Sequence, residues 1–215
     1  MASTADVKLI ASGSVLLSQP TWASEKGACG GDDWDCYTVG RNHLIQLMMD
    51  AGGKKKRERE EGGGGGGESC DYPVVLVGDY HFADFKRIAG GGGTAYGSAY
   101  GIADRAKEDA IVQVMSSGMS HSTAIPHEEC HTYLVDHDGM REEAGTEKCG
   151  VVAGPNWGQL DLDWESGRMR LSAMNGDVES ETGGGEAKGW IELDLRSGGK
   201  CEVVDSFSVN LELGP

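Results

Sequence analysis

The sequence lacks any long hydrophobic run. No segment of its 215 residues approaches the ~20 apolar residues that a membrane-spanning helix needs. The first residues, Met1 to Asp6, contain no basic residue, and the apolar stretch after them is short and interrupted, so no signal peptide is indicated. We therefore expect no membrane span, and the localisation of the chain stays open.

Positive charge is also scarce. The 19 Lys and Arg residues stand against 35 Asp and Glu residues, which gives a formal net charge of −16. Nucleic acids and anionic membrane surfaces would both repel such a chain, so neither is predicted as a partner. The charge fits a soluble protein that could collect cations, and the oligomeric state is not indicated.

Closely spaced cysteine pairs are absent. The six cysteines are scattered, and no CxxC pair occurs among Cys29, Cys36, Cys70, Cys130, Cys149 and Cys201. A set of disulfides and six reduced thiols are both compatible with this distribution.

Glycine, by contrast, is abundant, with 35 residues, and much of it lies in runs. The length suffices for one domain, but the runs shorten the part that can form a core. Residues 54–68, a charged KKKREREE stretch followed by glycines, are expected to be disordered because they cannot bury apolar area. The predicted organisation is a partial core over 1–53, a disordered insertion over 54–70 and a larger part over 71–215.

The part before the insertion predicts a strand and a helix. Residues 7–17 suggest a strand, a turn and a second apolar piece. Residues 39–50 predict a helix that ends at Gly52 and Gly53. Its apolar stripe is predicted to contain Leu44, Leu47 and Met48, with Arg41 and Asn42 outside it and His43 at the surface.

The central stretch begins with Val74–Val77, a short β-branched run that predicts a strand buried on both faces. Gly78 allows a sharp exit, and Asp79 and His81 follow immediately. Sites in α/β sheets are built at the carboxyl ends of strands, so Asp79 and His81 are candidate ligands for Fe, Zn, Mn or Ca. The alternative is a polar turn in which Asp79 caps the next segment.

Two further regions predict β-structure. Residues 110–115 predict a buried strand that leads to His121, which could face the same cleft as His81. Residues 154–158 predict a turn. Residues 159–164 alternate, with Leu160, Leu162 and Trp164 on one face, and pair with 169–174 as a hairpin. A strand over 190–195 and a last strand over 203–209 and 211–213 complete an antiparallel C-terminal region with one buried face.

A competing motif lies between these regions. Residues 127–131 (HEECH) match HExxH, in which His127 and His131 would bind zinc and Glu128 would activate water. His137 falls where metzincin peptidases have a third ligand, although Leu134 replaces their glycine. A zinc metallopeptidase and a polar surface loop are the two interpretations.

Four segments stand out in chain order: residues 33–37 with Arg41, residues 78–87, residues 115–122 and residues 155–164. Together, and in this order, they resemble segments of the alkaline phosphatase D (PhoD-like) metallophosphatases. Residues 78–87 (GDYHFADFKR) resemble the family's GDxHFAExxR segment, and residues 115–122 (MSSGMSHS) resemble TSSGLTHS. Residues 155–164 (PNWGQLDLDW) resemble PNFGxIxIDW. Residues 33–37 (DWDCY) with Arg41 are similar to DxWDGYxxER, with Cys36 in place of glycine.

The resemblance implies an α/β fold of the calcineurin-like type, a sandwich of two packed β-sheets with flanking helices and a β-rich end. It also implies a two-metal site that hydrolyses phosphomonoesters or phosphodiesters, with Asp79 and His81 as metal ligands. His121 matches a family residue, and a place near the cleft and a role in packing are the two alternatives for it. The family's earlier metal motifs have no counterpart in residues 1–70, so we expect an incomplete C-terminal portion of such an enzyme, and whether this portion is active alone stays open. A non-catalytic β-rich binding module is the remaining alternative.

Overall fold

The computed structural model describes residues 7–17, 34–61, 73–78, 81, 83–89, 101–102, 104, 110–118, 151–152, 154–176, 186–195 and 202–208. Among these residues, no helix has both the length and the apolar character required to cross a bilayer. The elements are β1 (Leu9–Ser12), η1 (Trp34–Tyr37), α2 (Thr38–Glu61), β2 (Val74–Val77), β3 (Ala83–Ala89), β4 (Ala110–Ser116), β5 (Val151–Val152), β6 (Asn156–Asp163), β7 (Arg168–Asn175), β8 (Ala187–Asp194) and β9 (Glu202–Ser208).

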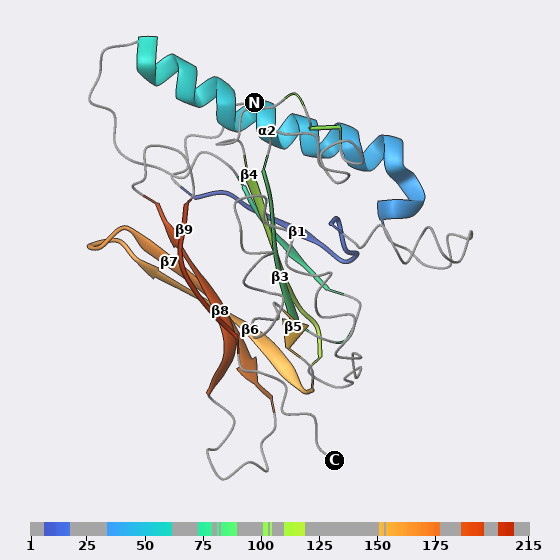
Figure 1. The fold of residues 1–215 in the computed structure, drawn as a ribbon, viewed down its shortest axis with the longest axis vertical. Coiled ribbons are helices and arrows are strands. Elements are labelled where there is room, and N and C mark those ends of the chain that lie inside the picture. Colours follow the sequence, from blue (N-terminus) through green and yellow to red (C-terminus); the bar gives the residue numbers. More distant parts are fainter. Residues whose placement is uncertain are drawn as a thin grey trace.

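The first sheet has five strands in the order β1-β2-β4-β3-β5. Strands β1, β2 and β4 are parallel, and β3 runs antiparallel to β4 and β5. The strands predicted at 74–77 and 110–115 are confirmed, and β2 lies inside the sheet, as its uninterrupted apolar sequence indicated. Because β1, β2 and β4 are parallel, their carboxyl ends share one edge of the sheet (Figure 1).

The second sheet has four antiparallel strands in the order β6-β7-β8-β9, which confirms the predicted antiparallel C-terminal region. A turn over residues 164–167 joins β6 and β7, and Gly167 there has φ of 68°. The predicted turn at 154–158 is shorter, because β6 already begins at Asn156. Leu160 pairs with buried Leu171 and packs against the core between the sheets, but Leu162 is 36% exposed, and Trp164 lies in the turn and is 60% exposed, so the predicted buried face of this segment is wrong beyond Leu160.

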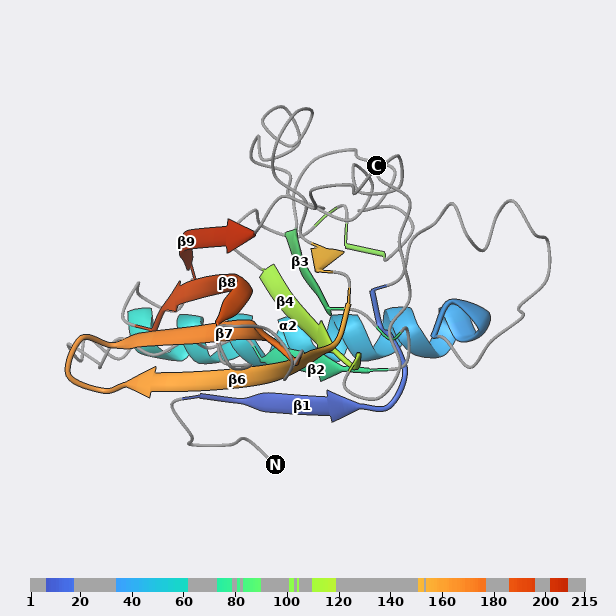
Figure 2. The ribbon, with the colours of Figure 1, turned by 90° about the horizontal axis from the view of Figure 1, so that it is seen from below.

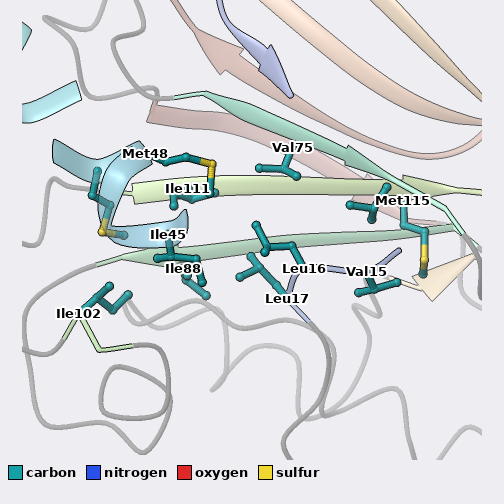
Figure 3. Packing of buried hydrophobic residues seen from close by; sticks show 12 residues of the cluster. Val15, Leu16, Leu17, Ile45, Met48, Val75, Ile88, Ile102, Ile111 and Met115 are labelled. Carbon is teal, nitrogen blue, oxygen red and sulfur yellow. The ribbon is translucent and has the colours of Figure 1, made fainter. Parts of the chain in front are cut away.

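Helix α2 and the second sheet cover opposite faces of the first sheet (Figures 1 and 2). Alternate residues of β2 and β4 point to the two faces. Val75, Ile111 and Met115 join the core under α2, whereas Val112 and Val114 join the core between the sheets. In Figure 3, Ile45 and Met48 of α2 lie against Ile88 and Ile111 of the sheet, and Leu16 and Leu17 extend the same cluster.

Helix α2 is longer than the predicted helix. It continues past Gly52 and Gly53 to Glu61, so the predicted end is wrong. Each glycine costs a helix about 1 kcal/mol, but the Lys, Arg and Glu residues that follow are strong helix formers. Residues 54–61 are therefore helical rather than part of a disordered insertion, and the rest of that insertion lies outside the described residues.

The buried face of α2 also differs from the predicted stripe. Met48 is buried, together with Ile45 and Met49, whereas Leu47 is 51% exposed. Arg41, expected outside the stripe, is only 5% exposed. Helices bury a face about 100° wide, and here that face is centred one position away from the apolar residues that stand out in the sequence. His43 is exposed, as predicted.

Candidate functional site

Small residues occupy the shared carboxyl edge of the parallel strands. Gly13 follows β1, Gly78 follows β2, and Ser117 and Gly118 follow β4. A methyl group at Gly78 would lie 3.6 Å from Cβ of Ser117 and 3.8 Å from the carbonyl oxygen of Gly13. The segments that follow β1, β2 and β4 therefore lie close together. The candidate site is the carboxyl edge of the first sheet, where these segments begin.

His81 lies at this edge, three residues beyond Gly78. The residue is exposed, and its backbone N–H donates a hydrogen bond to Oγ of Ser117 at 3.0 Å. Its φ is 62°, the left-handed region, and it is the one residue other than glycine with a positive φ in the described part of the chain. Histidine adopts this conformation more often than most residues, yet it costs about 1–3 kcal/mol and requires support from neighbours.

Asn156, the first residue of β6, is fully buried behind His81. Its side-chain Oδ1 accepts hydrogen bonds from Oγ of Ser116 at 2.8 Å and from the backbone N–H of Gly118 at 3.4 Å. Its Nδ2 donates to the carbonyl oxygen of Gly154 at 2.9 Å, and its own N–H donates to the carbonyl oxygen of Gly118 at 3.3 Å. One buried amide thus joins the end of β4 to the start of the second sheet.

Gly118 is enclosed by this network. A methyl group added to it would overlap Nδ2 of Asn156 and would lie 3.0 Å from the carbonyl oxygens of Gly154 and His81. The backbone of residues 116–118 therefore packs directly against both His81 and Asn156, and no larger residue fits at position 118 without displacing them.

Trp34 attaches the start of the helical region to the end of β1. Its Nε1–H donates to Oγ of Ser12 at 3.2 Å, and its backbone N–H donates to the carbonyl oxygen of Val15 at 3.3 Å. Ser12 in turn donates to the carbonyl oxygen of Ser14 at 2.8 Å. The segment that carries Cys36 and Arg41 is thereby fixed beside the same sheet edge.

The structure describes one of the histidines that the sequence singles out for metal binding, His81. Asp79, His121, His127, Glu128, His131 and His137 lie outside the described residues. Within the described part of the chain, no three or more His, Cys, Asp or Glu side chains are grouped as metal ligands. His81 fits the requirements of one ligand, because an exposed imidazole can present a ring nitrogen to a cation.

Sequence reasoning missed the supporting role of Asn156. The Pro-Asn-Trp-Gly stretch at 155–158 is typical of a turn, and nothing in its composition distinguishes a buried asparagine from an exposed one. Ser116, Ser117 and Gly118 belong to the segment that resembles TSSGLTHS and follow a predicted strand, but the sequence predicts no supporting role for them. The signal that was present is their placement directly after a buried strand, where close backbone approach requires small side chains.

Comparison with known proteins gives no match to any protein family, curated protein or solved structure.

Proposed function

We propose that the chain contributes to the active site of a metal-dependent phosphoric ester hydrolase related to the PhoD-like metallophosphatases. One observation carries the proposal. The four segments that resemble this family are separated in sequence, and residues of all four lie at or beside the shared edge of β1, β2 and β4.

Specific contacts connect these segments. Trp34 from the first segment is hydrogen-bonded to Ser12 at the end of β1. His81 from the second is bonded to Ser117 of the third, and Ser116 of the third is bonded to Asn156 of the fourth. The second, third and fourth segments thus contact one another directly, and the first is bonded to the end of β1 at the same edge, as a shared site would require.

The layered architecture also supports the proposal. Two sheets pack through one apolar core, and α2 covers the outer face of the first sheet. This arrangement is compatible with the calcineurin-like sandwich that the resemblance implies. Parallel strands that end at one edge are the usual location for ligand sites in α/β sheets.

His81 is the ligand that we assign to a metal at this edge, and Asp79, two residues earlier and outside the described residues, is its proposed companion. Imidazole and carboxylate donors together suit Fe, Zn, Mn or Ca. When bound, such metals would neutralise charge on the phosphoryl oxygens and activate water for attack. The role of His81 is to hold the ion at the strand edge, where a phosphate ester can approach from solvent.

The test is hydrolysis of p-nitrophenyl phosphate and bis-p-nitrophenyl phosphate with added Ca, Mn, Fe or Zn. We expect metal-dependent release of p-nitrophenol that falls at least about 100-fold in His81→Ala, in line with the loss of a metal ligand. His43→Ala is the matched control, because His43 is an exposed histidine on α2, and it should retain the wild-type rate.

Two outcomes would contradict the proposal. Casein cleavage that is lost in Glu128→Gln would instead support the zinc peptidase interpretation of residues 127–137. A folded chain that hydrolyses neither phosphate esters nor casein with any of these metals would leave the non-catalytic β-rich module.

A further inference from the structure

The hydrogen bonds of Asn156 fix the backbone of residues 116–118 on two sides. Oδ1 of Asn156 accepts from the N–H of Gly118, and the N–H of Asn156 donates to the carbonyl oxygen of the same glycine. The 2.8 Å bond from Ser116 adds a third point of attachment. Since Asn156 is fully buried, no water competes for these bonds, and the peptide groups around Gly118 are held in one orientation.

The fixed segment touches His81 at two points. Oγ of Ser117 accepts the hydrogen bond from the N–H of His81 at 3.0 Å. The next residue, Gly118, lies close to the carbonyl oxygen of His81. A methyl group on Gly118 would lie 3.0 Å from that oxygen. Both backbone polar groups of His81 are therefore bounded by residues that Asn156 holds in place.

We propose that Asn156 is a positioning residue for His81, which acts through Ser117 and Gly118 to maintain the left-handed backbone that keeps His81 at the carboxyl edge. This inference rests on the proposed function for its consequence in metal binding. Its structural part stands on the hydrogen bonds and the φ of 62° alone.

Gln113 provides a matched control in β4, the strand that leads into residues 116–118. It is a second fully buried amide, and it makes three hydrogen bonds to the backbone of Leu16 and Leu17. Replacing it removes a similar number of buried hydrogen bonds from β4 but none that reaches residues 116–118. If Asn156 only stabilised the fold, replacing Asn156 or Gln113 should alter His81 to the same extent. If Asn156 positions His81, only the replacement of Asn156 should alter it.

The experiment compares the full chain with Asn156→Ala, Ser117→Ala, Ser117→Thr and Gln113→Ala. The first readout is hydrogen exchange of the His81 amide by NMR. The second readout is the Mn²⁺ concentration at which paramagnetic broadening reduces the His81 ring signals to half their height. These signals are assigned by their absence from the spectrum of His81→Ala. Both are measured at a temperature where every variant is folded.

We expect Asn156→Ala and Ser117→Ala each to accelerate exchange of the His81 amide by about tenfold, the effect of one lost hydrogen bond. The half-broadening Mn²⁺ concentration should rise by about tenfold, as when a residue supporting a metal ligand is removed. Ser117→Thr, which keeps the hydroxyl, and Gln113→Ala should stay close to wild type on both readouts.

The inference is overturned if Asn156→Ala leaves His81 exchange unchanged, or if Gln113→Ala accelerates it equally. If Asn156→Ala does not fold, the comparison of Ser117→Ala with Ser117→Thr tests whether this contact positions His81. Both variants should fold, because Ser117 is only partly buried. If exchange responds as expected but Mn²⁺ never broadens the His81 ring signals, the positioning role stands and the metal-dependent function fails.

Discussion

At the scale of single residues, the backbone of His81 is the most informative feature. A histidine with φ of 62° is held against its own preference, and such strain is found most often at functional sites. The sequence indicated His81 as a site residue because it closely follows a buried strand. It could not indicate the left-handed backbone, since that conformation depends on Ser117 and Gly118, which are 36 or more residues away in the chain.

This strain can be measured by substitution. We expect His81→Gly to be more stable than His81→Ala by about 1 kcal/mol, because glycine adopts positive φ without steric cost. Urea unfolding followed by tryptophan fluorescence gives the difference. The same pair at His43, within α2, should show the opposite order, with alanine the more stable. Equal stability of the two His81 variants would mean that position 81 is not left-handed in solution.

Gln113 shows how a buried polar residue can serve packing alone. Its Oε1 accepts from the N–H groups of Leu16 and Leu17 at 3.1 and 2.7 Å, and its Nε2 donates to the carbonyl oxygen of Leu17. These bonds satisfy the backbone of a buried segment that belongs to no regular element. Position 113 interrupts the apolar run of β4 in the sequence, and only the contact with residues 16–17 explains the interruption.

Removal of this amide is expected to be costly. Gln113→Ala should lower the free energy of unfolding by about 3 kcal/mol, since three hydrogen bonds between buried groups are lost. The control is Gln159→Ala on β6, whose side chain bonds to exposed Asp161 and whose loss should cost about 0.5 kcal/mol or less. Similar midpoints in urea for the two variants would refute this assignment.

At the scale of elements, the strands were predictable and the helix end was not. Val74–Val77 and the alternating segment near Leu160 have the composition and the period of strands, and tertiary packing agreed with both. No element was predicted over 83–89, where charged and apolar residues are mixed, and β3 forms there by pairing with β4. The end of α2 was misplaced because two glycines were given more weight than the helix-forming residues that follow them.

The start of α2 offers a test of local stability. Gly40 is exposed, and a methyl group on it would meet nothing nearer than Cζ3 of Trp34 at 4.0 Å. Gly40→Ala should therefore raise the free energy of unfolding by about 0.5–1 kcal/mol through helix propensity. Gly101→Ala is the contrasting control and should be destabilising, because Gly101 has φ of 72° and its Cβ would lie 3.0 Å from Nε2 of Gln46. Thermal unfolding by circular dichroism would measure both.

The second sheet carries a cross-strand cluster on its outer face. Nε and Nη2 of Arg170 both donate to Oε2 of Glu192, at 3.1 and 2.8 Å, and the guanidinium lies 4.3 Å from the ring centre of Trp190. Arg170 is 45% exposed, so solvent screens much of the attraction. The pairing register that joins β7 to β8 places these three residues together.

We expect Arg170→Ala to cost about 1 kcal/mol, from the combined ion pair and cation–π contact. The loss should shrink at 1 M salt, where the ion pair is screened. Arg168→Ala, which loses only a 3.7 Å contact with Glu192, should cost less than Arg170→Ala at either salt concentration. A cost that does not depend on salt would assign the effect of Arg170 to packing.

At the scale of the whole molecule, two cores share one sheet. Ile45 belongs to the core under α2, and Leu171 belongs to the core between the sheets, while β2 and β4 contribute to both. The composition of β2 predicted burial on both faces, but nothing in the sequence alone specified which element covers each face. That arrangement depends on contacts between segments far apart in the chain.

Sharing one sheet should couple the two cores. Ile45→Ala and Leu171→Ala are each expected to destabilise the protein by about 2–5 kcal/mol. Each should shift the unfolding transitions seen by tryptophan fluorescence and by far-ultraviolet circular dichroism together. Separate transitions, with each variant moving only one of them, would show that the α2 layer and the second sheet unfold independently.

The fit between Gly118 and Asn156 also bears on how this protein can diverge. A side chain at position 118 would occupy the space of the amide at position 156, so a substitution at either position would require a compensating substitution at the other. When homologues are aligned, these two columns should covary, and lineages that lose one should also lose the histidine at position 81.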